Sequence, residues 1–275
     1  MPRTTLTHRA LLKIGGSDAS EFLQRIVTAD LNALAPAAAT PCALLSPQGK
    51  VLHEFLLSGS ETGFIIDVSR AFLPDLARRL MLFRLHADVT FEPLPGSRVL
   101  AIWNEDGGLR DLRFPEHTAR LYDDESEDTA SLEEWTRHRI LAGVLEVGTD
   151  YRGDDLFPHD VSLIENGGVS VGKGCFVGQE VVSRMHHRGT GRRRAAIVRG
   201  STSLPPPGTA IVADNRPLGT LGSSIDDLGL AIVRIDRLTV ATTASLPVFA
   251  AATELKFDVP PGASWTLEAE DAVQA

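Results

Sequence analysis

Cysteine is scarce in this sequence of 275 residues. The two cysteines are Cys42 and Cys175, and no CxxC pair occurs. A small secreted domain held by disulfides would carry many more, so a reducing compartment fits the composition better. Two thiols are also too few for a complete structural zinc site of cysteines, or for an iron–sulfur cluster held by this chain alone. We therefore expect no resident metal.

Long apolar runs are also missing. The first eight residues contain no apolar signal core, and no stretch offers the ~18 apolar residues that a membrane-spanning helix needs. The net charge is −9, which does not favour binding to DNA or to acidic lipid. We therefore expect a cytoplasmic protein that contacts neither membranes nor DNA directly.

The residues that are present predict an α+β protein with several domains. Hydrophobic residues make up 43% of the chain, which is enough for real cores, and domains cluster near ~100–150 residues. Helical and strand patterns mix in the first two thirds, and residues 144–172 read as a packed irregular loop. After residue 192, short strands separated by Pro and Gly turns are typical of a small β-barrel. The predicted domains are residues 1–95, 96–191 and 192–275.

The densest group of reactive side chains is the segment Lys173–Glu180, with the sequence KGCFVGQE. Its glycines favour a tight turn around Cys175, and the spacing of the apolar residues that follow predicts a helix from about Gly178. A helix N-terminus and a nearby lysine both favour the thiolate form of Cys175. Two interpretations stay open: an activated thiol, or a cysteine that fills space.

Two further side chains of this segment, Gln179 and Glu180, have a similar ambiguity. They are placed either to orient a ligand or to cap the helix that follows. Asp30, which follows an expected helix over residues 19–27, is either a pocket-lining acid or an ordinary loop residue.

A basic stretch follows the segment. Guanidinium groups suit carboxylates and phosphates, so in an acidic protein Arg184 and Arg188 predict a local anionic ligand, such as a glutamate tail. Pairing with the protein's own acids is the alternative. RNA binding is a third interpretation, but the stretch has no aromatic side chains on which bases would stack. The adjacent pair His186-His187 does not have the spacing of a metal site on a helix.

The segment KGCFVGQE resembles the K-G-C-[FY]-x-G-Q-E signature of the YgfZ family, the folate-binding proteins implicated in iron–sulfur cluster assembly and repair. The flanking residues 167–170 and 181–184 fit the same pattern. Near the start of the chain, residues 16–30 and 45–50 are similar to the folate-binding domain shared with the T-protein of glycine cleavage, an aminomethyltransferase. The resemblance covers nearly the whole chain.

This resemblance implies a T-protein-like, multi-domain α+β fold with a C-terminal small β-barrel and a central pocket for tetrahydrofolate. It implies folate and iron–sulfur proteins or cluster-assembly factors as partners. The expected role is a non-enzymatic accessory protein that supports [4Fe–4S] enzymes, including those that modify tRNA. The alternatives are a folate-dependent aminomethyltransferase or demethylase, and an RNA-binding module.

The resemblance also assigns roles to residues. It makes Cys175 the functional thiol, with a supporting shell of Lys173, Gln179 and Glu180. Asp160 lies near the position at which the T-protein has a folate-contacting glutamate. The segment 111–113 resembles a D-P-R segment of relatives, with leucine in the proline position, and nothing matches the T-protein's catalytic aspartate. The expected folate-binding residues are Asp30, Asp160, Lys173, Arg184 and Arg188.

Overall fold

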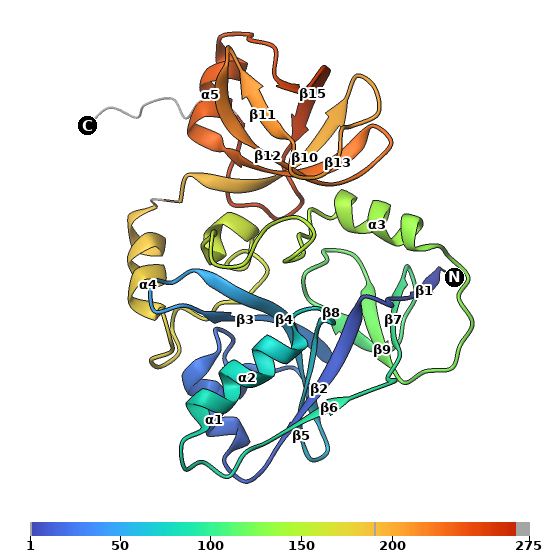
Figure 1. Cartoon of the computed structure of the whole chain (residues 1–275), viewed down its shortest axis with the longest axis vertical. Helices are drawn as coiled ribbons and strands as arrows, with labels where there is room; N and C mark the ends of the chain where they lie inside the picture. Colours follow the sequence, from blue (N-terminus) through green and yellow to red (C-terminus); the bar gives the residue numbers. More distant parts are fainter. Residues whose placement is uncertain (1, 190, 268–275) are drawn as a thin grey trace.

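The computed structural model describes residues 2–189 and 191–267. In Figure 1 a large sheet with two helices forms the lower part of the molecule, and a small barrel forms the upper part. The segment from α3 (Leu132–Leu141) to α4 (Gln179–Arg188) lies between them and along one side. No helix in the described part of the chain is long and apolar enough to cross a membrane.

A nine-stranded sheet organises the first half of the chain. Its strands are β1 (Arg3–Thr5), β2 (Arg9–Gly15), β3 (Ala38–Leu45), β4 (Val51–Ser60), β5 (Gly63–Ser69), β6 (Thr90–Leu94), β7 (Val99–Trp103), β8 (Leu109–Asp111) and β9 (Thr118–Tyr122). Their order across the sheet is β1-β7-β9-β8-β3-β4-β5-β2-β6. The pair β3 and β8 is parallel and the other pairs are antiparallel.

Strand β3 lies at the centre of this sheet and is buried along its whole length. Its side chains alternate between the two faces, as in any strand. On one face Cys42 packs in a core covered by α1 (Ala19–Ile26) and α2 (Leu73–Arg84), whereas on the other face Ala43 packs in a second core. The sheet therefore has cores on both faces, and the second face is the one that carries the irregular segment.

The irregular segment between α3 and α4 packs closely, as expected for residues 144–172. It contains the short helix η2 (Pro158–Val161) and buries Leu145, Leu163 and Phe176 in the second core. A second short helix, η1 (Leu31–Ala33), follows α1. These buried side chains confirm the expectation of a packed loop rather than a disordered one.

The C-terminal part is a closed barrel of six strands in the order β10-β13-β12-β11-β14-β15. The barrel closes where β15 pairs with β10, and its interior is filled by one hydrophobic core. Its elements are β10 (Arg193–Gly200), β11 (Ala210–Ala213), β12 (Arg216–Ile225), β13 (Leu228–Arg234), α5 (Ile235–Thr243), β14 (Phe249–Ala250) and β15 (Thr253–Asp258). The expected α+β fold with a C-terminal barrel is confirmed. The proposed domain limits stay a prediction, and the limit at residue 95 falls inside the nine-stranded sheet.

One buried arginine joins the two parts of the molecule. Arg139 on α3 donates to Asp150 Oδ2 at 2.5 Å, to the carbonyl of Val144 at 2.7 Å and to Ser223 Oγ on β12 at 2.6 Å. Asp150 Oδ1 in turn accepts a hydrogen bond from the backbone N–H of Ser223 at 2.7 Å. The position of the barrel on the lower part therefore depends on a buried charge pair.

Replacing Arg139 by Met should destabilise the protein by about 3–5 kcal/mol, because Asp150 would stay buried without its partner. The matched control is Arg137→Ala on the same helix, whose ion pair with Asp226 is exposed and is expected to contribute about 0–1 kcal/mol. Urea unfolding of the two variants measures both values. Equal losses in the two variants would contradict the role given to Arg139.

Candidate functional site

The segment Lys173–Glu180 forms a loop that sits against the turn between β3 and β4. Gly178 ends this loop at φ 80° and directly precedes α4, as the sequence predicts. A Cβ at Gly178 would lie 2.6 Å from the carbonyl oxygen of Ser46 and 3.0 Å from Gly49 Cα. Because no other residue tolerates both this backbone conformation and this contact, the close fit of the loop requires glycine.

Cys175 is exposed at the outer side of this loop, while its neighbour Phe176 is buried. Within the described residues its thiol has no hydrogen-bond partner. A hydrogen bond within the segment stabilises the loop, since Gln179 Nε2 donates to the carbonyl of Lys173 at 3.3 Å. The loop therefore presents the thiol to solvent from a backbone that is fixed on either side.

The structure gives Lys173 a different role from the expected one. Its Nζ is buried and donates to the carbonyls of Val27 at 2.8 Å and Ala29 at 2.6 Å. Burial lowers the pKa of Lys173, while the nearby Cys42 and Asp30 act in the opposite direction. The lysine thus anchors the loop to the segment after α1, and its hydrogen bonds lie there rather than at Cys175.

The two candidate folate-binding aspartates hold local structure. Asp30 Oδ1 accepts hydrogen bonds from the N–H of Asn32 at 3.1 Å and from Gln24 Nε2 at 2.9 Å, and so caps η1. Asp160 is buried, and its Oδ2 accepts from the N–H of Phe157 at 2.9 Å. Burial raises the pKa of Asp160 against the effect of nearby cationic groups, of which Lys50 is one.

The basic stretch is divided between α4 and β10 rather than gathered into one site. On α4, Arg184 pairs with Glu180 at 2.5 Å, and Arg188 is exposed near the helix end. On β10, Arg193 pairs with Asp155 at 3.4 Å. These pairs correspond to the alternative in which the arginines meet the protein's own acids, and such exposed pairs contribute little to stability.

His159 is a buried histidine behind this basic stretch. Neither of its ring nitrogens has a hydrogen-bond partner among the described residues, and its ring lies 6.1 Å from that of His186. Burial lowers the pKa of His159 to about 4, and the positive charges of Arg194 and His186 add to the effect. His159 is therefore neutral in the folded protein near neutral pH.

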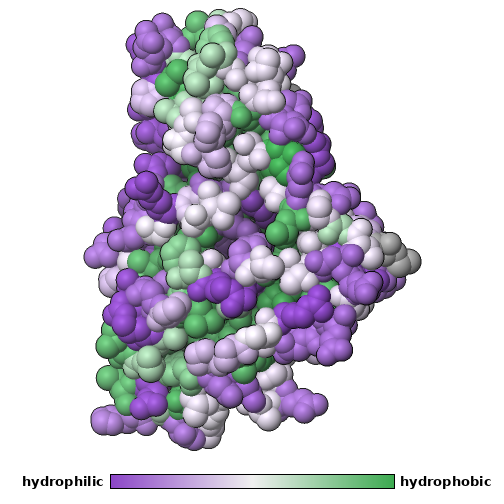
Figure 2. Space-filling view, turned by 45° about the vertical axis from the view of Figure 1, so that its right-hand side comes forward, coloured by the Kyte–Doolittle hydropathy of each residue, from purple (hydrophilic) through white to green (hydrophobic). Residues whose placement is uncertain are grey.

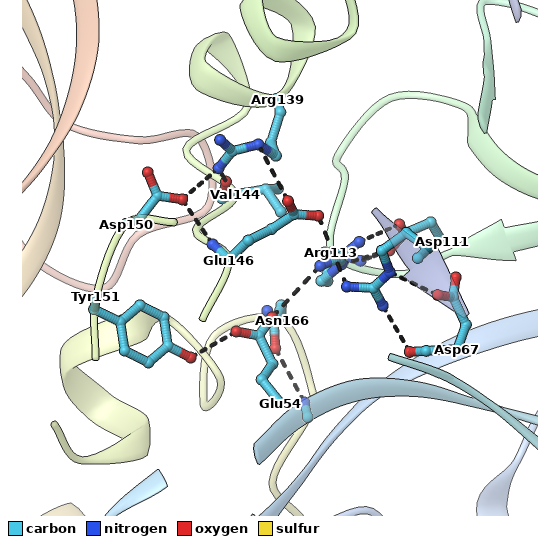
Figure 3. Close-up of polar contacts among 12 residues, drawn as sticks. Glu54, Asp67, Asp111, Arg113, Arg139, Val144, Glu146, Asp150, Tyr151 and Asn166 are labelled. Atoms are coloured by element: carbon cyan, nitrogen blue, oxygen red, sulfur yellow. Dashed lines mark hydrogen bonds and ion pairs between the residues drawn. The ribbon is translucent and has the colours of Figure 1, made fainter. Parts of the chain in front are cut away.

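A buried network of charges lies between the sheet and the irregular segment (Figure 3). Arg113 binds Asp111 through two hydrogen bonds of 2.8 and 3.0 Å, and its Nη1 lies 3.4 Å from Glu54 Oε1. Tyr151 donates its hydroxyl hydrogen to Glu54 Oε2 at 2.6 Å. The remaining ion pairs of the network join Arg9 to Asp67 and Glu146, Arg120 to Asp67 and Asp111, and Arg139 to Glu146 and Asp150.

Of the network residues, the sequence pointed only to Asp111 and Arg113, which are the ends of the segment that resembles a D-P-R segment of relatives. The available signal was a charged residue inside a run of apolar strand residues, as with Glu54 in β4 and Asp67 in β5. A charged side chain in such a strand is buried, and a buried charge needs a partner of opposite charge.

A cavity of about 140 Å³ opens beside this network. Burial raises the pKa of Glu54, which lines the cavity, although Arg113 acts against this effect. An aromatic ring, Phe114, and the backbone turn at Gly143–Val144 form part of the wall, and residues 260–263 after the barrel close another side. A carboxyl group, a guanidinium and an aromatic wall suit a flat heterocycle that carries N–H donors.

No group of three or more His, Cys, Asp or Glu side chains gathers as a metal site within residues 2–189 and 191–267. The exposed thiol of Cys175 and the cavity at Glu54 are two separate features of the described structure. Lys173, Gln179 and the segment after α1 belong to the first, and the buried network belongs to the second.

Comparison with known proteins gives matches for both parts of the chain. Residues 192–265 match the C-terminal β-barrel domain of CAF17. The human mitochondrial iron–sulfur cluster assembly factor IBA57 is 29% identical over 85% of this chain and 77% of its own length. The mouse protein of the same name is 27% identical with the same coverage, and the homologue from Coccidioides immitis is 25% identical over 85% of this chain and 71% of its own length.

Among solved structures, the glycine cleavage aminomethyltransferase T from Bartonella henselae superposes with a TM-score of 0.74. It covers 94% of this chain and 85% of its own, at 16% identity, and this likeness confirms the T-protein-like fold. The expectation of a cytoplasmic protein is wrong, because the IBA57 relatives are named as mitochondrial proteins.

Acid should destabilise the protein through His159. In an unfolded chain a histidine takes up its proton near pH ~6.5, whereas folded His159 does so at a pKa of about 4. Between these values the unfolded state binds more protons, so this contribution to stability is present above pH ~6.5 and is lost as the pH falls. In the variant His159→Leu, the free energy of unfolding should fall less steeply over this range.

Urea unfolding at several pH values measures this slope. The control is His187→Leu, which replaces an exposed histidine on α4 and should keep the wild-type slope. An unchanged slope in His159→Leu would rule out His159 as the source of the acid sensitivity.

Proposed function

We propose that this protein is a tetrahydrofolate-binding accessory factor in the assembly or repair of iron–sulfur clusters. It supports [4Fe–4S] enzymes, including those that modify tRNA. The observation that carries the proposal is an exposed cysteine on a braced loop, in a chain similar over most of its length to proteins named iron–sulfur cluster assembly factors.

The thiol of Cys175 is the group that meets the cluster. A thiolate is a ligand of iron in such clusters, but one thiolate does not hold a cluster alone. Because the described residues offer no further ligand set, the other ligands come from a partner protein, and the contact is transient. Lys173 and Gln179 hold the loop in one conformation. Binding of the partner protein therefore costs no conformational entropy for ordering the loop.

Folate is proposed to bind in the cavity beside Glu54. The carboxyl of Glu54 and the guanidinium of Arg113 fit the donors and acceptors of a pterin ring, and Phe114 supplies an apolar wall. At about 140 Å³ the cavity is smaller than the ~300–1,000 Å³ pockets that hold whole ligands of this class. The cavity therefore fits the pterin ring system, and the rest of the folate has to extend through the open side of the cavity.

Bound folate supplies one-carbon chemistry in enzymes that use it, and an aminomethyltransferase or demethylase is the second candidate function. The fold of the Bartonella henselae enzyme favours this candidate, although a likeness at 16% identity concerns the fold alone. Turnover separates the two functions. Consumption of an aminomethyl or methylamine donor with tetrahydrofolate would support the enzyme.

Replacing Cys175 by Ser should abolish the support of [4Fe–4S] enzymes, because the hydroxyl is a poor iron ligand. The measurement is the activity of a [4Fe–4S] enzyme in cells under oxidative stress, in which the variant replaces the wild-type protein. We expect at least a fivefold loss of activity at unchanged protein level. The control is Cys42→Ala, because Cys42 is buried and its burial raises the pKa of the thiol. Activity equal to wild type in Cys175→Ser would refute the role of the thiol.

Replacing Glu54 by Gln should weaken tetrahydrofolate binding by about tenfold or more, since a charge-assisted hydrogen bond contributes about 1.5–3 kcal/mol. Isothermal titration calorimetry measures the dissociation constant, and urea unfolding checks that the variant is folded. Glu180→Gln is the control, because Glu180 is exposed and does not line the cavity. Equal affinities in both variants would remove Glu54 from the folate site.

A further inference from the structure

A cleft of about 650 Å³ lies where the barrel meets the irregular segment, and we call it the barrel cleft. Residues 148–156 line it on one side, and residues of β12, of β13 and of the start of α5 line it on the other. On the face drawn in Figure 2, hydrophilic side chains lie beside hydrophobic ones at the level where the barrel meets the lower part. The volume falls within the ~300–1,000 Å³ of pockets that hold small organic ligands.

Cationic side chains outnumber acidic ones in the lining of the barrel cleft. Its carboxylates are Asp150 and Asp155, and its guanidinium groups are those of Arg152, Arg193, Arg234 and Arg237. Asp150 is buried and already binds Arg139 at 2.5 Å. Within the described lining, Asp155 alone is left to offset four positive charges. The cleft is therefore a basic site on a chain whose net charge is −9.

Two of these arginines have no acidic partner in the described part of the chain. Arg152 is exposed, and its side chain makes no hydrogen bond or ion pair there. Arg237 donates to the carbonyl of Pro217 at 2.5 Å, which holds its guanidinium without neutralising the charge. Guanidinium groups suit phosphates and carboxylates, so an anion in the cleft would gain two partners that are free to bind it.

The other two arginines are paired with aspartates. Arg193 lies 3.4 Å from Asp155, and Arg234 binds Asp236 through two hydrogen bonds of 2.7 and 2.9 Å. Asp236 does not line the cleft, whereas Asp155 does. The carboxylate of Asp155 is therefore the one acidic group of the described lining that competes with an incoming anion.

Apolar side chains form the inner wall of the barrel cleft. Leu156, Leu218, Leu221 and Ile232 line it and are buried. An organic anion buries its apolar part against such a wall, whereas an inorganic anion gains nothing from it. The lining therefore fits an anion that has an apolar body.

The lining fits a small molecule better than RNA. Bases of single-stranded RNA stack on aromatic side chains. Tyr151 is the aromatic residue of the described lining, but it is only 8% exposed, and its hydroxyl donates to Glu54 at 2.6 Å. It offers little ring surface on which a base could stack.

We propose that the barrel cleft binds a small organic anion with two or more negative charges, carried by phosphate or by carboxylate groups. The charged groups bind Arg152 and Arg237, and the apolar part lies against Leu156 and Leu218. Among the described residues, none lines both this cleft and the cavity at Glu54. The site is therefore separate from the proposed folate cavity and from Cys175, and it does not depend on the proposed function.

The experiment is an NMR titration of the full ¹⁵N-labelled chain with adenosine diphosphate and, separately, with citrate. The first probe carries phosphates and the second carries carboxylates, so the pair distinguishes the two sources of charge. Binding should shift the amide signals of Gly208 and Thr220 in the cleft and leave that of Gly262 at the other cavity in place. We expect a dissociation constant below about 1 mM for at least one probe. No shift with either probe at about 10 mM overturns the proposal.

Arg152→Gln should weaken binding of that probe by about tenfold, because it removes a charge-assisted hydrogen bond. The matched control is Arg110→Gln, which removes the same charge from an exposed arginine of β8 outside the cleft lining. Its affinity should stay within about twofold of wild type. Equal weakening in the two variants would mean that the probe responds to net charge alone, and it would overturn the site.

Asp155→Asn should change the affinity in the opposite direction. It removes the competing carboxylate and frees Arg193, so binding should tighten by about threefold. A gain of affinity does not arise from a misfolded variant. Unchanged or weaker binding would contradict the proposal.

Thr220→Trp tests whether the ligand lies inside the cleft. Thr220 is exposed on β12 and lines the cleft, so an indole ring there occupies the space of the ligand while all four arginines stay. Binding should be lost in a variant that urea unfolding shows to be folded. Wild-type affinity would place the anion on the outer surface and overturn the proposal.

Two competitors exclude other occupants. Saturating tetrahydrofolate should leave the bound probe in place, and displacement would assign the cleft to folate and overturn the proposal. A single-stranded RNA oligonucleotide should bind more weakly than the probe. Tighter RNA binding that is lost in Arg152→Gln would make the cleft a nucleic-acid surface and would likewise overturn the proposal.

Discussion

The buried charge network is the constraint on which the rest of the structure depends. Isolated buried charges are costly, so each member is tolerated only when its partners are in place. The members come from distant parts of the chain, and Arg139 extends the network to the barrel. The arginines of the network are Arg9, Arg113, Arg120 and Arg139, and its acids are Glu54, Asp67, Asp111, Glu146 and Asp150. The acids exceed the arginines by one, and burial raises the pKa of Glu54, which lies at the edge of the cavity.

The two cysteines lie in different environments. Cys42 is held as a buried thiol in the sheet, whereas Cys175 is exposed at the surface. Lys173 lies on the inner side of the loop and serves as an anchor through two backbone carbonyls. The sequence of the segment Lys173–Glu180 suggests a thiol activated by a neighbouring lysine. In the structure, Lys173 instead holds the loop to the segment after α1, and the thiol is exposed on that loop. This arrangement suits a contact that must form and break at one place on the surface.

Local features of the fold were predictable from the sequence. The helix start at Gly178 and the barrel after residue 192 follow from glycines, turns and short apolar runs, which act over a few residues. The network was not predictable, because Asp67 and Asp111 become neighbours of Arg120 only through the order of strands. The compartment was predicted wrongly, since cysteine content reports a reducing environment and does not distinguish one such compartment from another.

The strand order also fixes when the protein folds during translation. β1 precedes its pairing partner β7 by about a hundred residues of chain, and β3 likewise precedes its parallel partner β8. A nascent chain therefore holds unpaired strand edges until β9 has left the ribosome, and pairing between distant segments is slow. The barrel strands, by contrast, come from one continuous stretch and pair only with one another. Because Ser223 lies on β12 of the barrel, Arg139 gains this partner only after the barrel strands have been made.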